Sequence, residues 1–374
     1  MKVMSYQSID TLQNVLRETV FSHTKDAKKA AGRCLGTLIE IITYYLLNEW
    51  KMQDAISIER ALPEYGNPDI THNVEFTLHP IIREETRPHA NSVKFSAKNI
   101  VKDFGLSDKI IIKNHNLLDK DGSIRNACTI AESEKFIYHA TLYTLDNEYS
   151  TIGMCTQLKH PYAMFECKRV GVEEGMKKGP QTIEKAKQGA YVAKTTSALQ
   201  KFRNEHGERM GLIYSNGKPI IAPYEQLLQQ IINSNDTEIL KDFTLSVGIV
   251  SNHGNWFTSK DQNKELKVLA QSYDWLLFLT DEGLAAFITE LLLLPQESCQ
   301  PIRNAFLNSY KEGKKSNVFT KIKMEYTAHL ALCRYFHANI RRIETWFNVI
   351  TPETSSIQEL KKALNTLQDK PWRY

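Results

Sequence analysis

The sequence has no pair of cysteines in the CxxC spacing that zinc ribbons and redox motifs use, and its six cysteines are scattered along the chain. Neither a zinc ribbon nor a disulfide framework is indicated, and reduced thiols fit best. The first twenty residues also lack the uninterrupted apolar core and the cleavage site of a secretory signal. From these absences we expect a cytoplasmic protein.

Long apolar runs are missing as well. The most apolar stretch, residues 283–295, contains Glu290 and is well short of the roughly 20 residues that a bilayer-spanning helix needs. We therefore expect no membrane span. The motifs HExxH, GxSxG and GxGxxG are absent, and no histidine stands in metal-ligand spacing with a cysteine. Nothing in the sequence thus indicates a zinc site, a serine hydrolase or a dinucleotide-binding fold.

A strong charge of one sign is also absent, because 47 Lys and Arg face 43 Asp and Glu, for a net charge of +4. With 42% hydrophobic residues, the chain has the composition of an ordinary globular protein, and 374 residues allow one large domain or two moderate ones. The basic residues are nevertheless concentrated in residues 159–209 and 301–344, so the remainder is acidic on balance. Such segregation is typical of a protein that contacts a phosphate backbone.

The order of periodic segments predicts a mixed α/β fold. Apolar residues at helical spacing predict a long amphipathic helix over 24–50, and strands are expected at 55–60 and 74–82. Residues 83–135 are polar and irregular, which indicates an insertion. Further strands are expected at 136–144, 162–170, 211–215, 245–251 and 275–280. A helix is expected after Gly179-Pro180, and largely helical structure over 301–348.

One tetrapeptide carries most of the functional information. In Phe165-Glu166-Cys167-Lys168, the side chains of a strand alternate between faces, so Glu166 and Lys168 project to one side and the two apolar residues to the other. A carboxylate and an ammonium group on one strand face can together hold a divalent cation and orient a water molecule. Hydrolysis of a phosphodiester needs both, and a second carboxylate would complete the site.

The tetrapeptide and Pro68-Asp69, together with the order of the predicted elements around them, resemble the PD-(D/E)xK nuclease superfamily over roughly residues 25–215. Among its members the sequence looks most like a type II restriction endonuclease. The resemblance implies a central mixed β-sheet flanked by helices, a Mg²⁺ cofactor and double-stranded DNA as the partner. It assigns metal binding to Asp69, Glu166 and the Cys167 carbonyl, and water positioning to Lys168.

The first acid has a rival. Asp146 follows the predicted strand 136–144 and stands much closer to Glu166 in the sequence than Asp69 does. It would need no insertion between the two strands. Asp69 is preferred because Pro-Asp-Ile follows the first helix and strand in the order that the family shows. Both acids stay open as candidates for the second carboxylate.

Several basic and polar residues are candidates for DNA contact. Lys177 and Lys178 lie in the loop after the predicted catalytic strand, where they could contact the backbone or base edges. Lys185 shares a predicted helix face with Gln181 and Gln188, because the three are spaced by four and three residues. The resemblance also draws attention to Glu40, since family members often carry a glutamate in the first helix.

The main hypothesis is therefore a Mg²⁺-dependent type II site-specific deoxyribonuclease. It has a nuclease core over 1–250 and a mostly helical region over 251–374 for DNA recognition or dimerisation. Cutting both strands of a symmetric site needs two active sites related by a two-fold axis, so a homodimer is expected. The alternatives are a structure-specific or nonspecific repair nuclease and a non-catalytic DNA-binding protein.

Overall fold

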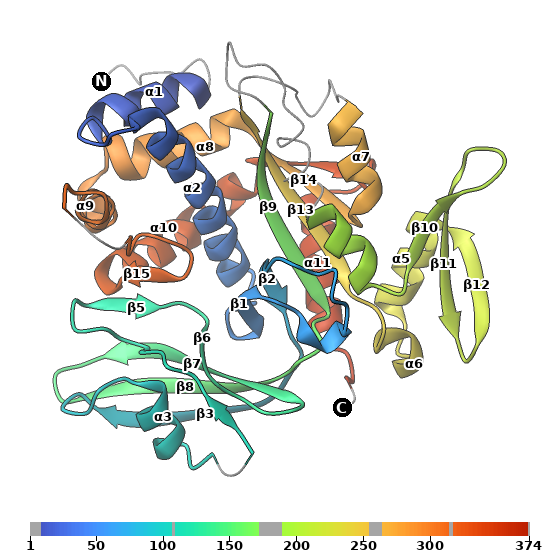
Figure 1. The fold of residues 1–374 in the computed structure, drawn as a ribbon, viewed down its shortest axis with the longest axis horizontal. Coiled ribbons are helices and arrows are strands. Elements are labelled where there is room, and N and C mark those ends of the chain that lie inside the picture. Colours follow the sequence, from blue (N-terminus) through green and yellow to red (C-terminus); the bar gives the residue numbers. More distant parts are fainter. Residues whose placement is uncertain (1–8, 107–108, 172–188, 254–263, 314–316, 373–374) are drawn as a thin grey trace.

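The computed structural model describes residues 9–106, 109–171, 189–253, 264–313 and 317–372, and it places a six-stranded mixed sheet at the centre of the molecule (Figure 1). The strands, in spatial order, are β1 (Ile56–Arg60), β2 (Val74–Leu78), β9 (Ala163–Gly171), β13 (Leu245–His253), β14 (Trp275–Leu279) and β16 (Phe347–Thr351). β9, β13 and β14 run parallel, and the other neighbours are antiparallel. The predicted α/β class with a mixed sheet flanked by helices is confirmed.

Both faces of this sheet are covered, which explains why its strands are largely buried along their length. All five residues of β14 are buried, as are all five of β2. On one face, α2 (Ala27–Glu49) packs against β9, α1 (Ile9–Thr19) and α10 (Tyr326–Glu344). The Asp26 side chain caps α2 by accepting a hydrogen bond from the Lys29 backbone N–H at 3.1 Å.

α2 is long and apolar enough to cross a membrane by length and composition alone. Within its most apolar window, however, 67% of the residues are buried inside the protein, and their side chains form part of the main hydrophobic core. The helix is the one element of the described chain that passes this test, and its burial is that of a core helix.

The opposite face of the sheet is covered by the helical residues 189–196 and by α7 (Lys264–Ser272). Val192 and Leu269 from these helices pack with Met164 of β9 and Val250 of β13 in a second hydrophobic cluster. β9 therefore lies in the middle of three layers, between α2 on one side and these two helices on the other.

A second, five-stranded sheet lies between β2 and β9 in the sequence. Its spatial order is β3 (Ile81–Ala90), β8 (Tyr149–Leu158), β7 (Phe136–Leu145), β6 (Cys128–Glu132) and β4 (Ile111–Ile112), with α3 (Ala97–Asp103) packed on it. The predicted insertion over 83–135 lies within this unit, but the unit extends to Leu158 and includes the strand predicted at 136–144. β2 and β9 nevertheless pair directly, because the chain leaves the central sheet after β2 and returns to it at β9.

The remaining elements surround the central sheet. β10 (Gln200–Arg203), β11 (Arg209–Ser215) and β12 (Lys218–Pro223) form a three-stranded sheet, and β15 (Lys323–Glu325) pairs with β5 (Ser123–Arg125). The other helices are α5 (Tyr224–Asn233), α6 (Thr237–Leu240), α8 (Asp281–Ile288), α9 (Gln300–Ser309) and α11 (Ile357–Gln368). Short helical turns lie at Gln53–Ala55, Pro63–Tyr65, Thr289–Leu293 and Glu297–Cys299.

The predicted boundary at residue 250 falls inside β13. Because β14 and β16 belong to the central sheet, the C-terminal region is built into the core and is not a separate helical domain.

Candidate active site

β9 brings Glu166 and Lys168 to one position near the middle of the molecule. The strand pairs with β13 along its whole length, but with β2 only from Ala163 to Phe165. Phe165 and Cys167 pack into the hydrophobic core on the α2 side, whereas Glu166 and Lys168 lie close to each other, with Nζ 3.3 Å from Oε2. This is the alternation that the sequence predicts for these four residues.

A second carboxylate comes from β2. The β2–β9 ladder stops at the Phe76–Phe165 pair, so the two strands separate just beyond it. Glu75 fills the gap: its Oε2 accepts a hydrogen bond from the Cys167 backbone N–H at 2.6 Å, and its Oε1 accepts one from Lys168 Nζ at 3.3 Å. Lys168 thus lies between two buried carboxylates, one from each strand.

A second lysine extends the arrangement toward α2. Lys321 is buried, and its Nζ lies 3.1 Å from Glu40 of α2, 3.3 Å from Glu59 of β1, and over the ring of Phe76. Glu59 reaches this position from a backbone with a φ of 53°, a left-handed conformation that is uncommon for a residue with a side chain. We refer to Glu40, Glu59, Glu75, Glu166, Lys168 and Lys321 as the acid–lysine cluster.

Glu166 is the most deeply buried member of this cluster, since its side chain has no exposed surface. His72 Nε2 lies 3.3 Å from Oε1, but neither carboxylate oxygen has a hydrogen-bond partner of good geometry among the described residues. Gly189 makes room for it, because a Cβ there would stand 3.0 Å from Glu166 Cγ and 2.6 Å from the hydroxyl of Tyr273. A buried carboxylate without hydrogen bonds is costly unless a positive charge compensates it.

The pKa directions within the cluster point to the same shortage of positive charge. Burial raises the pKa of Glu75, and the charges of Lys168 and Lys321 offset this only in part. Burial, and then the neighbouring Glu75, raise the pKa of Glu40 to about 7. Burial alone would lower the pKa of Lys168, but the charges of Glu75 and Glu166 outweigh it and leave that pKa above its usual value. Both lysines therefore stay charged, while Glu40 and Glu75 remain undercompensated.

The donor set fits a hard divalent cation. With four carboxylates ionised and two lysines protonated, the acid–lysine cluster has a formal charge of −2, which one divalent ion would neutralise. Mg²⁺ prefers oxygen ligands such as carboxylates and main-chain carbonyls. Glu75, Glu166 and the Cys167 carbonyl are the oxygens that could hold it, and Glu40 lies close enough to interact electrostatically with Glu75.

The structure does not bring Asp69 into this cluster. Asp69 is exposed in the turn before β2, where its carboxylate accepts a hydrogen bond from the Tyr191 hydroxyl at 3.2 Å. Asp146 lies in the β7–β8 hairpin of the other sheet, where Thr144 and the side chain of Asn91 contact it. The acid that lies beside Lys168 is Glu75, six positions after the predicted one.

The three predicted DNA-contacting residues, Lys177, Lys178 and Lys185, lie outside the described residues, as do Gln181 and Gln188. Their assignment stays a prediction. Glu40, by contrast, lies where the resemblance to the nuclease family led us to look, beside Lys321 and near Glu75.

Glu59, Glu75 and Lys321 are the members of the cluster that the sequence analysis missed. A signal for Glu75 exists, because it is a lone acid within the apolar strand VEFTL and all five residues of that strand are buried. A charged residue in a strand that is buried on both faces calls for a functional explanation. Lys321 has no such local signal, since it lies in an irregular segment and only the tertiary fold brings it to the cluster.

The other group of potential ligands among the described residues is less suited to a metal. Asp54, Glu84 and Cys155 have ligand atoms within 4.8 Å of one another. Asp54, however, already accepts a hydrogen bond from Thr141 at 3.2 Å, and burial raises the pKa of Cys155, which keeps the thiol protonated. A metal-binding thiol must be deprotonated, so this group carries no assignment.

Comparison of the chain with protein-family models, with curated proteins and with solved structures found no match.

Proposed function

We propose that the protein is a Mg²⁺-dependent endonuclease of the type II restriction class that hydrolyses phosphodiester bonds in double-stranded DNA. The observation that carries the proposal is the convergence of two buried carboxylates from adjacent strands, Glu75 and Glu166, on the ammonium group of Lys168. Glu166 has no hydrogen-bond partner of good geometry among the described residues, and burial raises the pKa of Glu75. The amine lies between them, where it can orient a water molecule.

The order of elements around this site supports the proposal. A helix, α2, precedes the antiparallel strands β1, β2 and β9. The helical residues 189–196 follow, then β10 to β12, α5 and α6, and then β13, which lies parallel to β9. With the elements from β10 to α6 counted as a further insertion, this order agrees with the helix–strand–strand–strand–helix–strand core that the sequence resemblance implies. The five-stranded sheet is an insertion between its second and third strands.

Within the proposed site each group has a separate role. Glu75, Glu166 and the Cys167 carbonyl would hold Mg²⁺, which supplies Lewis-acid activation of the phosphate and of a bound water. Lys168, held in its charged form by both carboxylates, orients the attacking water and stabilises negative charge on the phosphate. Lys321 fixes Glu40 and Glu59, so the carboxylates approach one another at a tolerable electrostatic cost.

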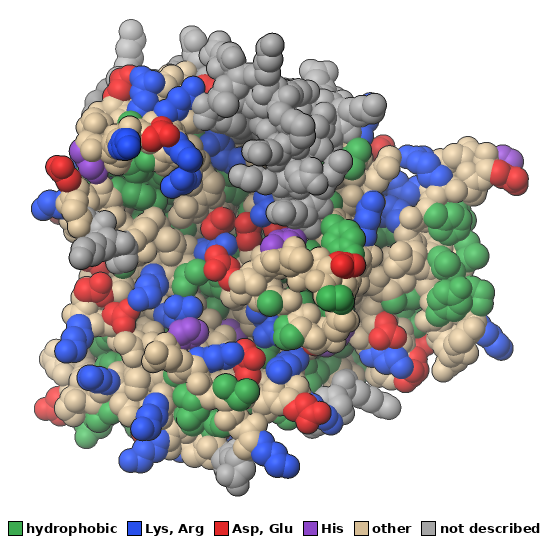
Figure 2. Space-filling model, in the orientation of Figure 1, with side chains coloured by type: hydrophobic (Ala, Val, Ile, Leu, Met, Phe, Trp, Pro, Cys, Tyr) green, Lys and Arg blue, Asp and Glu red, His purple; other side chains and the backbone are tan. Residues whose placement is uncertain are grey.

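A cleft beside the site provides a path for the substrate. It has a volume of about 470 Å³ and lies between β1 and the five-stranded sheet, with Glu59 of the acid–lysine cluster in its wall. Arg60, Lys113 and Arg125 also line it, together with Glu132, which lies 3.9 Å from Arg60 and 3.1 Å from Lys113. In Figure 2 acidic, basic and histidine side chains gather in the hollow between the two sheets, facing the viewer. Cationic groups next to a carboxylate centre are suited to a polyanionic substrate.

Cleavage of both strands at a symmetric site requires two copies of this centre, so we expect the protein to act as a homodimer on DNA. The recognised sequence depends on side chains that reach base edges, and the segment after β9 that carries Lys177 and Lys178 remains our predicted source of such contacts.

The test is to incubate phage and plasmid DNA with the purified protein in Mg²⁺ or in EDTA, beside the Glu166→Gln variant. The proposal predicts discrete Mg²⁺-dependent fragments whose ends map one site, with none from the variant. A Mg²⁺-dependent smear would replace the restriction class with a nonspecific nuclease. Intact linear and plasmid DNA in every lane, together with retained DNA binding, would replace it with a DNA-binding protein.

A further inference from the structure

A second pocket has a volume of about 290 Å³. Its walls come from the end of the helical segment 189–196, from the small sheet formed by β10, β11 and β12, and from the residues that precede β14. Four basic residues line this pocket, namely Lys194, Lys201, Arg203 and Arg209. We refer to it as the basic pocket.

Two acids offset these four cations only in part. Asp274 is buried, and its carboxylate accepts hydrogen bonds from the Tyr224 hydroxyl, from the Ser246 backbone N–H at 2.7 Å and from the Ser246 hydroxyl at 2.9 Å. Glu225 lies 3.7 Å from Arg209, so two carboxylates face four cations. The excess positive charge is therefore available to a ligand.

Two contacts hold the ammonium group of Lys201 in place. Its Nζ donates to the main-chain carbonyl of Tyr273 at 2.8 Å and lies 4.2 Å from the centre of the Tyr224 ring. Burial lowers the pKa of Lys201 to about 8, and no carboxylate lies within ion-pair distance among the described residues. Asp274 favours the charged amine from a longer distance, and an anion in the pocket would add to that effect.

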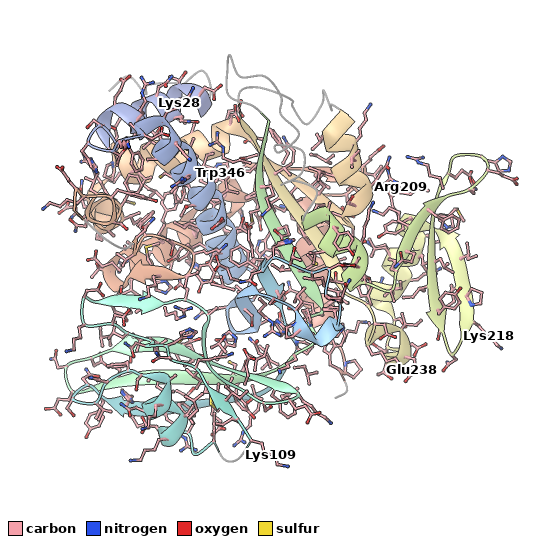
Figure 3. All side chains as sticks on the ribbon, in the orientation of Figure 1. Lys28, Lys109, Arg209, Lys218, Glu238 and Trp346 are labelled. Carbon is pink, nitrogen blue, oxygen red and sulfur yellow. The ribbon has the colours of Figure 1, made fainter. Side chains whose placement is uncertain are left out.

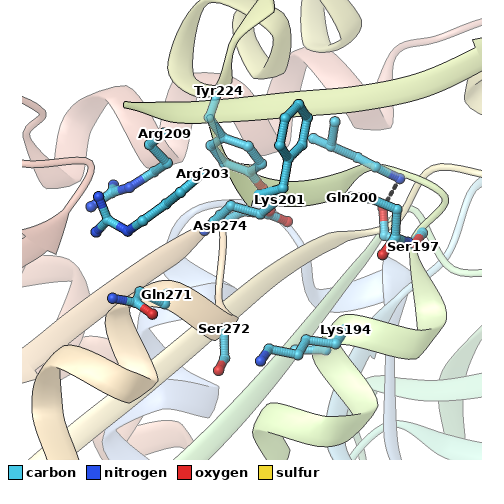
Figure 4. Close-up of a pocket in the computed structure, with 13 residues that line it drawn as sticks. Lys194, Ser197, Gln200, Lys201, Arg203, Arg209, Tyr224, Gln271, Ser272 and Asp274 are labelled. Atoms are coloured by element: carbon cyan, nitrogen blue, oxygen red, sulfur yellow. Dashed lines mark hydrogen bonds between the residues drawn. The ribbon is translucent and has the colours of Figure 1, made fainter. Parts of the chain in front are cut away.

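The other cations project toward the same space. Figure 4 shows the guanidinium groups of Arg203 and Arg209 on one side of the pocket and the ammonium group of Lys194 on the other, with Gln271 and Ser272 between. Arg203 donates to the carbonyl of Gly207 at 2.6 Å, and Arg209 to the Thr351 hydroxyl at 3.3 Å, which leaves further N–H donors on both. Guanidinium and ammonium donors around one opening suit a phosphate group.

Tyr273 and the helical segment connect the basic pocket to the acid–lysine cluster. The Tyr273 carbonyl accepts from Lys201, while a Cβ at Gly189 would stand 2.6 Å from the Tyr273 hydroxyl and 3.0 Å from Glu166.

We propose that the basic pocket binds a backbone phosphate of the DNA near the scissile one, a role that rests on the proposed nuclease function. Basic side chains gather around the position at which Figure 3 labels Arg209, on the same face as the acidic, basic and histidine side chains at the centre of Figure 2, so one duplex can reach both. The contact positions the scissile phosphate over Glu166 and carries no sequence information.

The test measures the salt dependence of DNA binding by the full-length protein. Kd for a fluorescent duplex is determined at several KCl concentrations in EDTA, so that the DNA stays intact. The Lys194→Gln/Arg203→Gln double variant changes two exposed side chains of the pocket, and Lys218→Gln changes an exposed lysine of the same small sheet that lies outside it. Each lost phosphate contact lowers the slope of log Kd against log salt by about 1.

We expect the slope of the double variant to fall by roughly 1 to 2, on specific and nonspecific duplexes alike, and that of Lys218→Gln to stay at the wild-type value. An unchanged slope in the double variant would overturn the proposal. If ATP or inorganic phosphate raises the melting temperature of the wild type but not of the double variant, and the slopes are equal, the pocket takes a free phosphate compound and the DNA assignment is overturned.

The same variants separate this proposal from the nuclease assignment. If the wild type binds DNA with the expected slope difference but never cuts with Mg²⁺, the pocket assignment stands and the nuclease assignment fails. If the wild type cuts and the slopes are equal, only the pocket assignment fails.

Discussion

The five-stranded sheet and the six-stranded sheet differ in how their buried polar side chains are paired. Where the five-stranded sheet meets β1, the buried His139 contacts the Ser57 hydroxyl at 3.0 Å and the Thr129 hydroxyl at 3.3 Å, and Ser57 donates to Gln157. We refer to Ser57, Thr129, His139 and Gln157 as the histidine network. Its members are hydrogen-bonded to one another, and burial lowers the pKa of His139 to about 3, which keeps it neutral.

The acid–lysine cluster of the six-stranded sheet is arranged in the opposite way. Its groups are charged, acids outnumber lysines, and the deepest carboxylate, Glu166, has no hydrogen bond among the described residues. Buried polar groups in folded proteins are normally paired, and a cluster that is not needs a ligand or a function to explain it. Pairing, and not burial alone, therefore distinguishes a structural polar group from a candidate catalytic one.

The largest expected effect comes from removing the charge of the deepest acid. Glu166→Gln keeps the side-chain shape but cannot hold a divalent cation, so the single-turnover rate of Mg²⁺-dependent cleavage should fall on the order of 10³-fold or more, since a metal ion supplies several kcal/mol. Glu84→Gln, an exposed acid on β3, is the matched control and should cleave at the wild-type rate. Equal rates for the two variants would contradict the assignment.

A smaller loss is expected for the amine. Lys168→Gln should lower the cleavage rate by about 10²-fold, the lower end of the range for a positioned proton-transfer or water-orienting group. Because Glu75 and Glu166 remain, the Mg²⁺ concentration for half-maximal rate should not rise. Titration of the rate with Mg²⁺ separates the two effects, with the exposed Lys241→Gln as control. A large increase in the Mg²⁺ requirement without loss of maximal rate would be inconsistent with this role.

Metal binding should also stabilise the fold, because it supplies the charge that the cluster lacks. Mg²⁺ at about 100 times its Kd should raise the free energy of unfolding by roughly 2.7 kcal/mol. Denaturant melts in Mg²⁺ and in EDTA measure this difference, which should vanish in Glu75→Gln. His139→Gln should keep it, because the histidine network holds no metal. If Mg²⁺ stabilised Glu75→Gln but not His139→Gln, the metal would bind at the histidine network and not at the acid–lysine cluster.

The smallest effect concerns the histidine network and pH. The folded protein holds His139 neutral, whereas the unfolded chain takes up a proton below its ordinary pKa of 6.5, so His139 reduces stability as the pH falls from about 6.5 toward 3. Its contribution to the slope is at most about 1.4 kcal/mol per pH unit.

His139→Gln should therefore lower stability at pH 7 by about 1–3 kcal/mol, through lost hydrogen bonds, yet show a shallower decline in acid. Urea melts between pH 7 and pH 4 measure both quantities, and cleavage at pH 7 should be unchanged. If the free energy of unfolding of the variant fell with pH as steeply as that of the wild type, His139 would not be the cause of the lower stability in acid.

Strand alternation and helix periodicity were enough to predict the α/β class, the helix that contains Glu40, and the shared position of Glu166 and Lys168. These features depend on neighbours in the sequence. The first acid could not be predicted in the same way, because Glu75 and Cys167 are 92 positions apart and meet only through strand pairing across an inserted sheet. The Pro-Asp dipeptide pointed to Asp69, whereas the strand geometry places Glu75 beside Lys168.

Lys321 and the C-terminal strands show a second limit. The segment between α9 and β15 has no regular pattern, and the partners of Lys321 come from α2 and β1 at the other end of the chain. A division of the chain near residue 250 separates regions by composition, but β14 and β16 complete the same sheet as β1 and β2. Contacts between distant segments set both features, and no local pattern encodes them.

We propose that Glu75 and Glu166, from adjacent strands, form one metal-dependent nuclease centre with Lys168. The most direct measurement is the initial rate of Mg²⁺-dependent cleavage by Glu75→Gln and by Asp69→Asn, each compared with the wild type on the same DNA. The structure predicts a loss on the order of 10³-fold for Glu75→Gln and a rate within about twofold of wild type for Asp69→Asn, since surface changes away from a site have small effects. Full activity in Glu75→Gln with a large loss in Asp69→Asn would contradict the claim.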